Sequence, residues 1–181
     1  GSTALISHIP GSSTQPCDGI TQLNGSSADG RFVLFTSNCY NLVAGLTDNN
    51  NTFDTFVYEV ATGIVTLACP AAATPGATPS LGSSGIAISS DGSSVLLSSR
   101  STDLVAGMGA SPLYYNTYVR DRGTGTTLLA SRKLGSPTIG PNYDSAAIAL
   151  SADGHRVLFD TRATDVLPGI VDTNGFEDAF L

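Results

Sequence analysis

The stretch SADGRFVLF at residues 27–35 occurs three times in the chain. Its copies are SSDGSSVLL at 89–97 and SADGHRVLF at 151–159. Each copy is an Asp-Gly turn that leads directly into an apolar strand, and the interval from Asp29 to Asp91 equals that from Asp91 to Asp153. A fixed period of this size is typical of propellers and solenoids, in which each unit buries its face only against its neighbours. The sequence therefore predicts a repeat protein with three similar units.

Each unit contains strand-like segments separated by turn residues, and helical periodicity is nowhere sustained. The segments that follow the Asp-Gly turns are apolar at successive positions, which is typical of strands covered on both faces. We therefore expect an all-β fold built from four-stranded units. The first unit spans residues 19–69, the second 82–131, and the third 144–181, which holds only three strands.

The N-terminus matches the strand that the third unit lacks. Residues 1–7, GSTALIS, align with GTTLLAS at 125–131, the fourth strand of the second unit. In the repeat register, Leu181 corresponds to Val119 and Gly1 corresponds to Gly125. Only a turn as long as residues 120–124 therefore separates the end of the third unit from the start of its fourth strand. The sequence thus predicts one domain, residues 1–181, in which residues 1–7 are the fourth strand of the closing unit and the chain is broken at a turn.

The repeat resembles that of a known family. SADGRFVLF is followed by NLVAG at 41–45, by DTFVY at 54–58 and by a Thr62-Gly63 turn, and this pattern resembles the TolB-type, WD-like β-propeller repeat. The resemblance covers essentially the whole chain in three copies. It implies three four-stranded propeller blades. It implies no single activity, because the family includes periplasmic translocation proteins, peptidase propeller domains and many exported proteins.

Three blades cannot close a ring, because propellers need about four to eight. Two chains related by a two-fold axis would give a six-bladed propeller, in which the unpaired strand ending at Leu181 takes its fourth strand from residues 4–6 of the other chain. We therefore expect a homodimer with exchanged terminal strands. The alternative is an excised or engineered half-propeller without activity of its own.

The charge distribution excludes some partners. The formal net charge is -7 and Lys133 is the only lysine, so no basic surface can neutralise nucleic acid phosphates or anionic lipids. No apolar run approaches the roughly 18 residues of a membrane span. We expect neither nucleic acid nor a membrane as a partner.

The three cysteines all lie in the first repeat. Cys17 and Cys39 lie beyond the same end of two adjacent expected strands, so they can form a disulfide. The alternative is that these two and Cys69 are small buried hydrophobic residues. The Lys-poor, Ser/Thr/Gly-rich composition together with a disulfide favours an exported protein, periplasmic or extracellular.

Long loops on one rim of the ring are the expected functional face. Short turns join strands one to two and three to four, whereas the connections at the opposite rim are long, and binding residues collect on long loops of a rigid scaffold. Arg100 with Asp103, and Arg162 with Asp165, recur at the same register there, and we expect exposed ion pairs. Aromatic rings and a carboxylate near the central opening suit a small molecule or a cation, unless the tyrosines only cap the loops, and the long-loop face as a whole suits a small molecule or a protein partner. The candidate ligand-binding residues are His8, Tyr114, Tyr115, Asn142, Tyr143 and Asp144.

A second motif on this rim suits a cation. DNNNTFD at 48–54 recurs as DTNGFED at 172–178, and oxygen atoms at positions i, i+2 and i+6 can surround Ca²⁺. A terminal bidentate Glu is lacking, and the alternative is that these side chains form Asx turns before a strand. The candidate calcium ligands are Asp48, Asn50, Asp54, Asp172, Asn174 and Asp178.

The sequence offers little for catalysis. It has no nucleophile elbow, no zinc-binding His-Glu-x-x-His and no phosphate loop. We therefore expect a module that binds a small ligand or a partner. The alternative is a calcium-dependent hydrolase of the six-bladed phosphotriesterase or lactonase type, with Asp144 or a loop Asp as base or nucleophile toward an ester or phosphoester.

Overall fold

The computed structural model describes residues 3–109 and 114–181, and in these ranges it contains strands and no helix. The all-β fold class is confirmed, as three antiparallel sheets. Within the described ranges no helix is available that could cross a membrane. The first sheet has the order β1 (Thr21–Ser26), β2 (Phe32–Ser37), β3 (Asp54–Glu59), β4 (Ile64–Leu67). The second has β5 (Ser83–Ile88), β6 (Ser94–Ser99), β7 (Asn116–Asp121), β8 (Thr126–Leu129), and the third β9 (Ser145–Leu150), β10 (Val157–Thr161), β11 (Asp178–Phe180).

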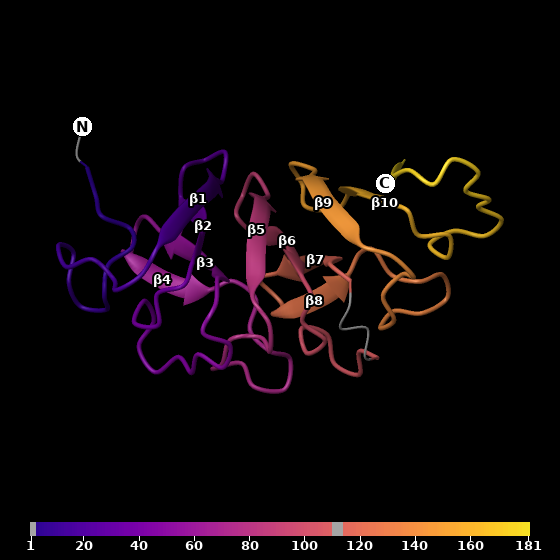
Figure 1. Ribbon diagram of the computed structural model, residues 1–181. Helices are drawn as coiled ribbons and strands as arrows, with labels where there is room; N and C mark the ends of the chain where they lie inside the picture. Colours follow the sequence, from indigo (N-terminus) through magenta and orange to yellow (C-terminus); the bar gives the residue numbers. More distant parts are fainter. Residues whose placement is uncertain (1–2, 110–113) are drawn as a thin grey trace.

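The three sheets stand side by side and do not close into a ring (Figure 1). Their first strands, β1, β5 and β9, are neighbours along the row, and the Asp-Gly turns lie at the upper ends of these strands in the view of Figure 1. The two ends of the chain lie at opposite ends of the row. The third sheet accordingly has three strands, and residues 3–7 form no strand within this chain.

Each Asp-Gly turn is built from the same hydrogen bonds. The Ser27 hydroxyl donates to Asp29 Oδ1 at 2.7 Å, and the Arg31 N–H donates to the same oxygen at 3.0 Å. Gly30 adopts φ +72°, which glycine reaches without steric cost. The same bonds recur in the turns at 89–93 and 151–155. The acceptor role of the aspartates lowers the pKa of Asp29 and of Asp91 to about 2.

Backbone hydrogen bonds join these turns from sheet to sheet. The Ala28 N–H donates to the Ser90 carbonyl at 3.0 Å, and the Ser90 N–H donates to the Ala152 carbonyl at 2.8 Å. Residues 28, 90 and 152 are equally spaced along the chain, so the ladder repeats with the sequence period. Within the described chain it stops at Ala152 because there is no fourth sheet.

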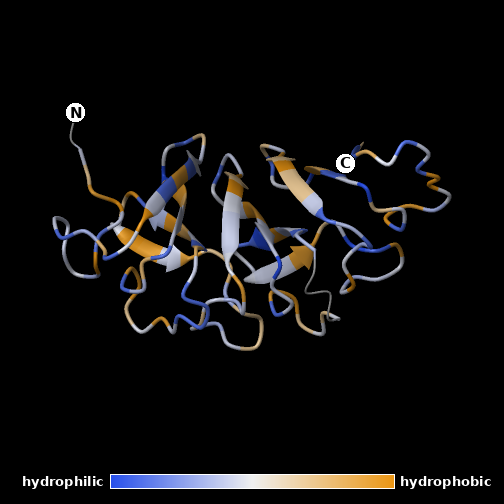
Figure 2. Ribbon diagram, in the orientation of Figure 1, coloured by the Kyte–Doolittle hydropathy of each residue, from blue (hydrophilic) through white to orange (hydrophobic). Residues whose placement is uncertain are grey.

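Two apolar cores lie on the two faces of the first sheet. Leu34 and Val57 pack between the first and second sheets against Val95, Leu97 and Tyr118. On the other face, Phe35, Phe56, Tyr58 and Val65 form a second core with Leu42, and Ile6 of the N-terminal segment packs against it. The first strands differ in character: β9 is mostly hydrophobic, whereas β1 contains strongly hydrophilic residues (Figure 2).

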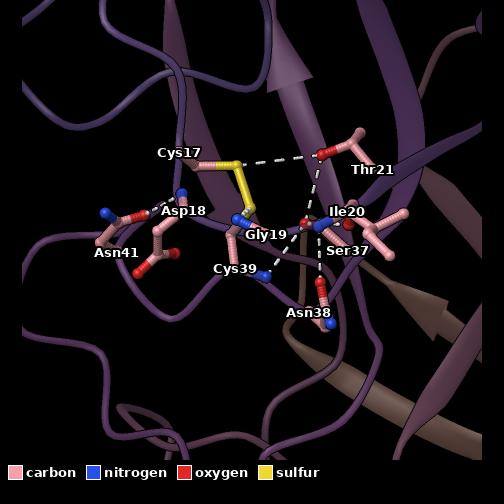
Figure 3. Close-up of a disulfide and its surroundings, with 9 residues drawn as sticks. All are labelled: Cys17, Asp18, Gly19, Ile20, Thr21, Ser37, Asn38, Cys39 and Asn41. Carbon is pink, nitrogen blue, oxygen red and sulfur yellow. Dashed lines mark hydrogen bonds between the residues drawn. A yellow bond between two sulfur atoms is a disulfide. The ribbon is translucent and has the colours of Figure 1, made fainter.

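A disulfide joins Cys17 to Cys39, so the pairing that the strand arrangement allowed is confirmed (Figure 3). It ties the N-terminal loop to the segment after β2, beside the bonds from the Gly19 N–H to Cys39 Sγ (3.1 Å) and from the Ile20 N–H to Asn38 Oδ1 (2.7 Å). Cys69 is a buried free thiol, and desolvation raises its pKa to about 11. The disulfide is consistent with an oxidising, exported environment.

Candidate functional site

Equivalent loops meet where neighbouring sheets adjoin, opposite the Asp-Gly turns. We call the meeting point of the first and second sheets the first junction, and that of the second and third sheets the second junction. At the first junction, Thr52 and Phe53 precede β3 and residues 81–82 precede β5. At the second, Tyr114 and Tyr115 precede β7 and Tyr143 and Asp144 precede β9.

The second junction brings together four of the six residues that the sequence predicted for a ligand. The rings of Tyr114 and Tyr143 stack with centroids 5.6 Å apart and an interplanar angle of 21°. The Tyr115 N–H donates to Asp144 Oδ1 at 2.6 Å. These interactions pair the two rings with each other and occupy one carboxylate oxygen of Asp144, as expected if the tyrosines cap the loops.

Asn142 and His8 have other surroundings. Asn142 Oδ1 accepts the Thr164 N–H at 3.0 Å, so this side chain ties its loop to the loop after β10. His8 lies on the outer face of the first sheet, where its ring meets Tyr58 edge-on with centroids 6.1 Å apart. In this chain His8 is therefore not part of either junction.

The predicted ion pairs of the rim are wrong. Asp103 accepts the Ser80 N–H at 2.9 Å, and Asp165 accepts the Asn142 N–H at 2.9 Å. Both carboxylates are turned toward backbone donors of the loop that precedes the first strand of their own sheet. Asp165 also lies 3.9 Å from Lys133. The arginines consequently have other partners than the sequence spacing suggested.

Arg100 and Arg162 each reach a junction. The Arg100 guanidinium lies over the Tyr115 ring, 4.3 Å from its centroid, which is cation–π geometry. Arg162 lies 5.8 Å from the Tyr143 centroid and pairs with Glu177 at 2.8 Å. This ion pair raises the pKa of Arg162, and the pKa of Glu177 is lowered first by a hydrogen bond from its own backbone N–H and then by Arg162. Their recurrence at the repeat period was the signal in the sequence for these two residues.

A cavity of about 460 Å³ opens at the first junction. Arg100 and Tyr115 lie at its edge, and the other lining side chains offer hydroxyls and apolar surface. No histidine, carboxylate or cysteine lines it, so its described lining supplies no general base or activated nucleophile. The lining residues are Thr52, Phe53, Leu81, Gly82, Ser83, Ser84, Ser98, Arg100 and Tyr115.

The loop at 48–54 has the hydrogen bonds of an Asx turn. Asp48 Oδ1 accepts the N–H groups of Asn50 and Asn51 at 3.0 and 2.9 Å, and Asn50 Oδ1 accepts the Thr52 N–H at 2.9 Å. The same turn forms in the third unit, where Asp172 Oδ1 accepts the N–H groups of Asn174 and Gly175 at 2.9 and 2.7 Å. These oxygens face backbone donors, and the described residues bring no three His, Cys, Asp or Glu side chains together around a common point. In both loops the Asp and Asn oxygens thus accept backbone hydrogen bonds, which is the arrangement of the Asx-turn alternative.

Asp54 and Asp178 close the two motifs in different surroundings. Asp54 is only 2% exposed, whereas Asp178 is exposed at the open end of the third sheet. Desolvation raises the pKa of Asp54 to about 7, the Asn50 amide opposes the rise, and the charge of Asp48 adds to it. The second unit has the neutral Asn116 at this buried position.

Comparison with known proteins gives no matching family model and no similar curated protein. The functional argument consequently depends on the repeat geometry and on the two junctions.

Proposed function

We propose that the chain is half of a six-bladed β-propeller of the TolB type, completed by a second copy, and that this ring is a module that binds a small ligand or a partner at its long-loop rim. The observation that carries the proposal is the regular row of sheets with an open cavity at the first junction. A cavity with one guanidinium, several hydroxyls and aromatic walls suits binding better than catalysis.

The ladder of backbone bonds supports a closed ring. Two steps, from Ala28 to Ser90 and from Ser90 to Ala152, repeat with the same geometry. In a six-bladed ring the next step would run from the Ala152 N–H to the Ala28 carbonyl of the second copy. Ring closure would therefore pair the Ala152 N–H and the Ala28 carbonyl, which lie at the two ends of the ladder in the single chain.

The position of the N-terminal segment supports strand exchange. Ala68, just after β4, packs against Val95 of the second sheet, and the equivalent Ile6 packs against Phe35 of the first. Ile6 therefore lies where the end of a preceding fourth strand would lie. The preceding blade in the ring is the third sheet of the other copy, in which β11 has one strand edge without a partner.

The solution mass tests the ring. One chain is 18.5 kDa, so we expect twice that mass by light scattering. Ile6→Asp should produce the monomer mass, because it places a charge against the apolar face of the first sheet. Ala4→Asp is the matched control: the equivalent Thr66 and Leu128 are exposed, so this variant should stay dimeric. A wild-type monomer would contradict the ring.

A screen of neutral and charged small aromatic compounds tests the rim. Compounds that bind should shift the amide resonances of Gly82 and Ser84 at the first junction. A hydrolytic activity on an ester and phosphoester panel that disappears when Arg100 or Tyr115 is replaced would contradict a purely binding role.

A calcium-dependent hydrolase is the competing proposal. It requires ligand sets that the Asx turns at 48–54 and 172–178 do not preform. If EDTA lowers the melting temperature and abolishes a hydrolytic rate, and Ca²⁺ restores both, this competing function replaces the one that we propose.

A further inference from the structure

We infer that the cavity at the first junction binds the anionic head group of a small organic molecule, with the Arg100 guanidinium as its counter-ion. The inference rests on the proposed binding function and names the class of ligand. It is carried by a comparison between the two junctions of the same chain, in which equivalent residues have different partners.

The first step concerns charge. Arg100 and Arg162 occupy equivalent positions, one repeat period apart. Arg162 is neutralised by Glu177 at 2.8 Å. The position equivalent to Glu177 is Tyr115, so Arg100 lies over an aromatic ring instead, and no described carboxylate comes within ion-pair distance of it. In a chain with a net charge of -7, the first junction thus keeps an uncompensated positive charge.

The second step concerns space. At the second junction, the rings of Tyr114 and Tyr143 stack on each other across the two loops. The equivalent residues at the first junction are Thr52 and Leu81, which leave the cavity of about 460 Å³. The residue equivalent to Asp144 is Gly82, where an added Cβ would lie 2.6 Å from the Phe53 carbonyl oxygen, so the two loops approach closely there and leave no room for a carboxylate. The first junction therefore has a cavity without a carboxylate in its described lining, whereas at the second junction Asp144 accepts the Tyr115 N–H.

In the proposed ring the third junction lies between the two copies. Its residue equivalent to Arg100 is Asn38, whose Oδ1 accepts the Ile20 N–H at 2.7 Å. That junction has no guanidinium at this position. Each copy accordingly has one junction that combines an open cavity with an unpaired arginine.

The third step concerns ligand chemistry. A guanidinium binds carboxylate and phosphate groups with two parallel hydrogen bonds. The hydroxyls of Ser84 and Ser98 line the same cavity as further donors, and Phe53, Leu81 and Tyr115 supply apolar surface for the body of the molecule. The matching ligand is a small molecule with one carboxylate or phosphate head and a flat apolar body.

The test is an NMR titration of the chain 1–181 with benzoate, phenyl phosphate and the neutral benzyl alcohol, on the wild type and two variants. Arg100→Gln removes the proposed counter-ion, and Arg162→Gln is the matched control at the second junction. Both arginines lie at the surface, and circular dichroism checks that each variant is folded. We expect Arg100→Gln to weaken benzoate binding at least tenfold, about 1.4 kcal/mol, and Arg162→Gln to change it less than about twofold.

The outcomes separate the two proposals. Equal benzoate affinity in the wild type and in Arg100→Gln overturns the anion inference. Binding of benzyl alcohol as tight as that of benzoate also overturns it, but this second outcome leaves the proposed binding function of the rim in place. If neither the anionic probes nor the neutral probe shifts the amide resonances of Gly82 or Ser84, the anion inference and the proposed binding function both fail. A preference for benzoate or for phenyl phosphate supports the inference and identifies the head group.

Discussion

At the scale of single residues, the repeats provide their own comparison. The same buried position holds Asp54 in the first unit and Asn116 in the second. Burial penalises the charged form of Asp54, so its pKa rises to about 7, whereas Asn116 cannot ionise and instead buries an Oδ1 without a hydrogen-bond partner among the described residues. The sequence motif identified Asp54 as a candidate ligand. Its burial could not be read from the sequence, because it depends on β5 of the next unit, where the Ser83 hydroxyl accepts the neighbouring Thr55 N–H.

We expect the free energy of unfolding to fall as the pH rises from 3.8 to about 7. In this window the native state keeps a proton on Asp54 that the unfolded chain has lost, so stability decreases by at most about 1.4 kcal/mol per pH unit. Asp54→Asn should remove this slope and stabilise the protein at neutral pH. Urea unfolding of both proteins at several pH values measures the effect.

The exposed aspartates act in a separate window. Their pKa values of about 2 mean that Asp29 and Asp91 contribute stability above pH 3.8, and this is lost as the pH falls toward 2. The Asp54→Asn variant should retain that acid-side loss. A slope between pH 4 and 7 that is unchanged in the variant would contradict the assignment to Asp54.

At the scale of elements, the repeat period predicted where the strands lie, because turn residues and apolar runs are local signals. It did not predict the irregularity in each first strand, where Asn24, Ile86 and Ile148 are left without a partner in the adjacent strand. One of these residues is an asparagine and two are isoleucines, so no turn-forming residue type common to all three marked the bulge. The ion pairs were wrong for a similar reason, since Asp103 and Asp165 bind backbone groups of distant loops.

The turn glycines should differ in how well they tolerate alanine. Gly30 and Gly92 both have positive φ, and for alanine this alone costs about 1 kcal/mol. A Cβ on Gly92 would also lie 2.1 Å from the Phe32 ring, whereas none is within 4 Å at Gly30. We expect Gly92→Ala to lose about 1–3 kcal/mol more than Gly30→Ala, as measured by chemical denaturation. Equal losses would show that the first two sheets do not pack closely at this turn.

The disulfide should stabilise the first unit through the chain it closes. Cys17 and Cys39 are 22 residues apart, a loop for which the entropy model gives about 3 kcal/mol. The Cys17→Ser, Cys39→Ser double variant should unfold at correspondingly lower denaturant. Cys69→Ser is the control, because Ser131 occupies the equivalent position. If Cys69→Ser loses as much stability as the double variant, the loss in the double variant reflects the replacement of buried sulfur by a hydroxyl and not the removal of the crosslink.

At the scale of the whole molecule, the open row of sheets connects the architecture to the site. The sequence predicted the rim on which Tyr114, Tyr115, Tyr143 and Asp144 gather. It did not predict that Tyr114 and Tyr143 would stack on each other, because stacking joins residues from two different sheets. The cavity lies instead at the first junction, where Thr52 and Leu81 occupy the positions of these two tyrosines. A search for aromatic residues alone therefore pointed to the second junction and not to the first.

Joining two copies end to end tests the ring directly. In the proposed ring, the repeat positions between Leu181 of one copy and Gly1 of the next correspond to residues 120–124, and their sequence, Arg-Asp-Arg-Gly-Thr, can serve as the linker. We expect this tandem chain to be a monomer of about twice 18.5 kDa, with a melting temperature independent of concentration, because strand exchange has become intramolecular. The single chain should melt at lower temperature on dilution. The same tandem carrying Ile6→Asp in its second copy should lose most of the increase in melting temperature over the single chain, because a charged residue then lies against the apolar face of the first sheet. A tandem that associates further, or melts no higher than the dilute single chain, would mean that the two halves do not complete each other.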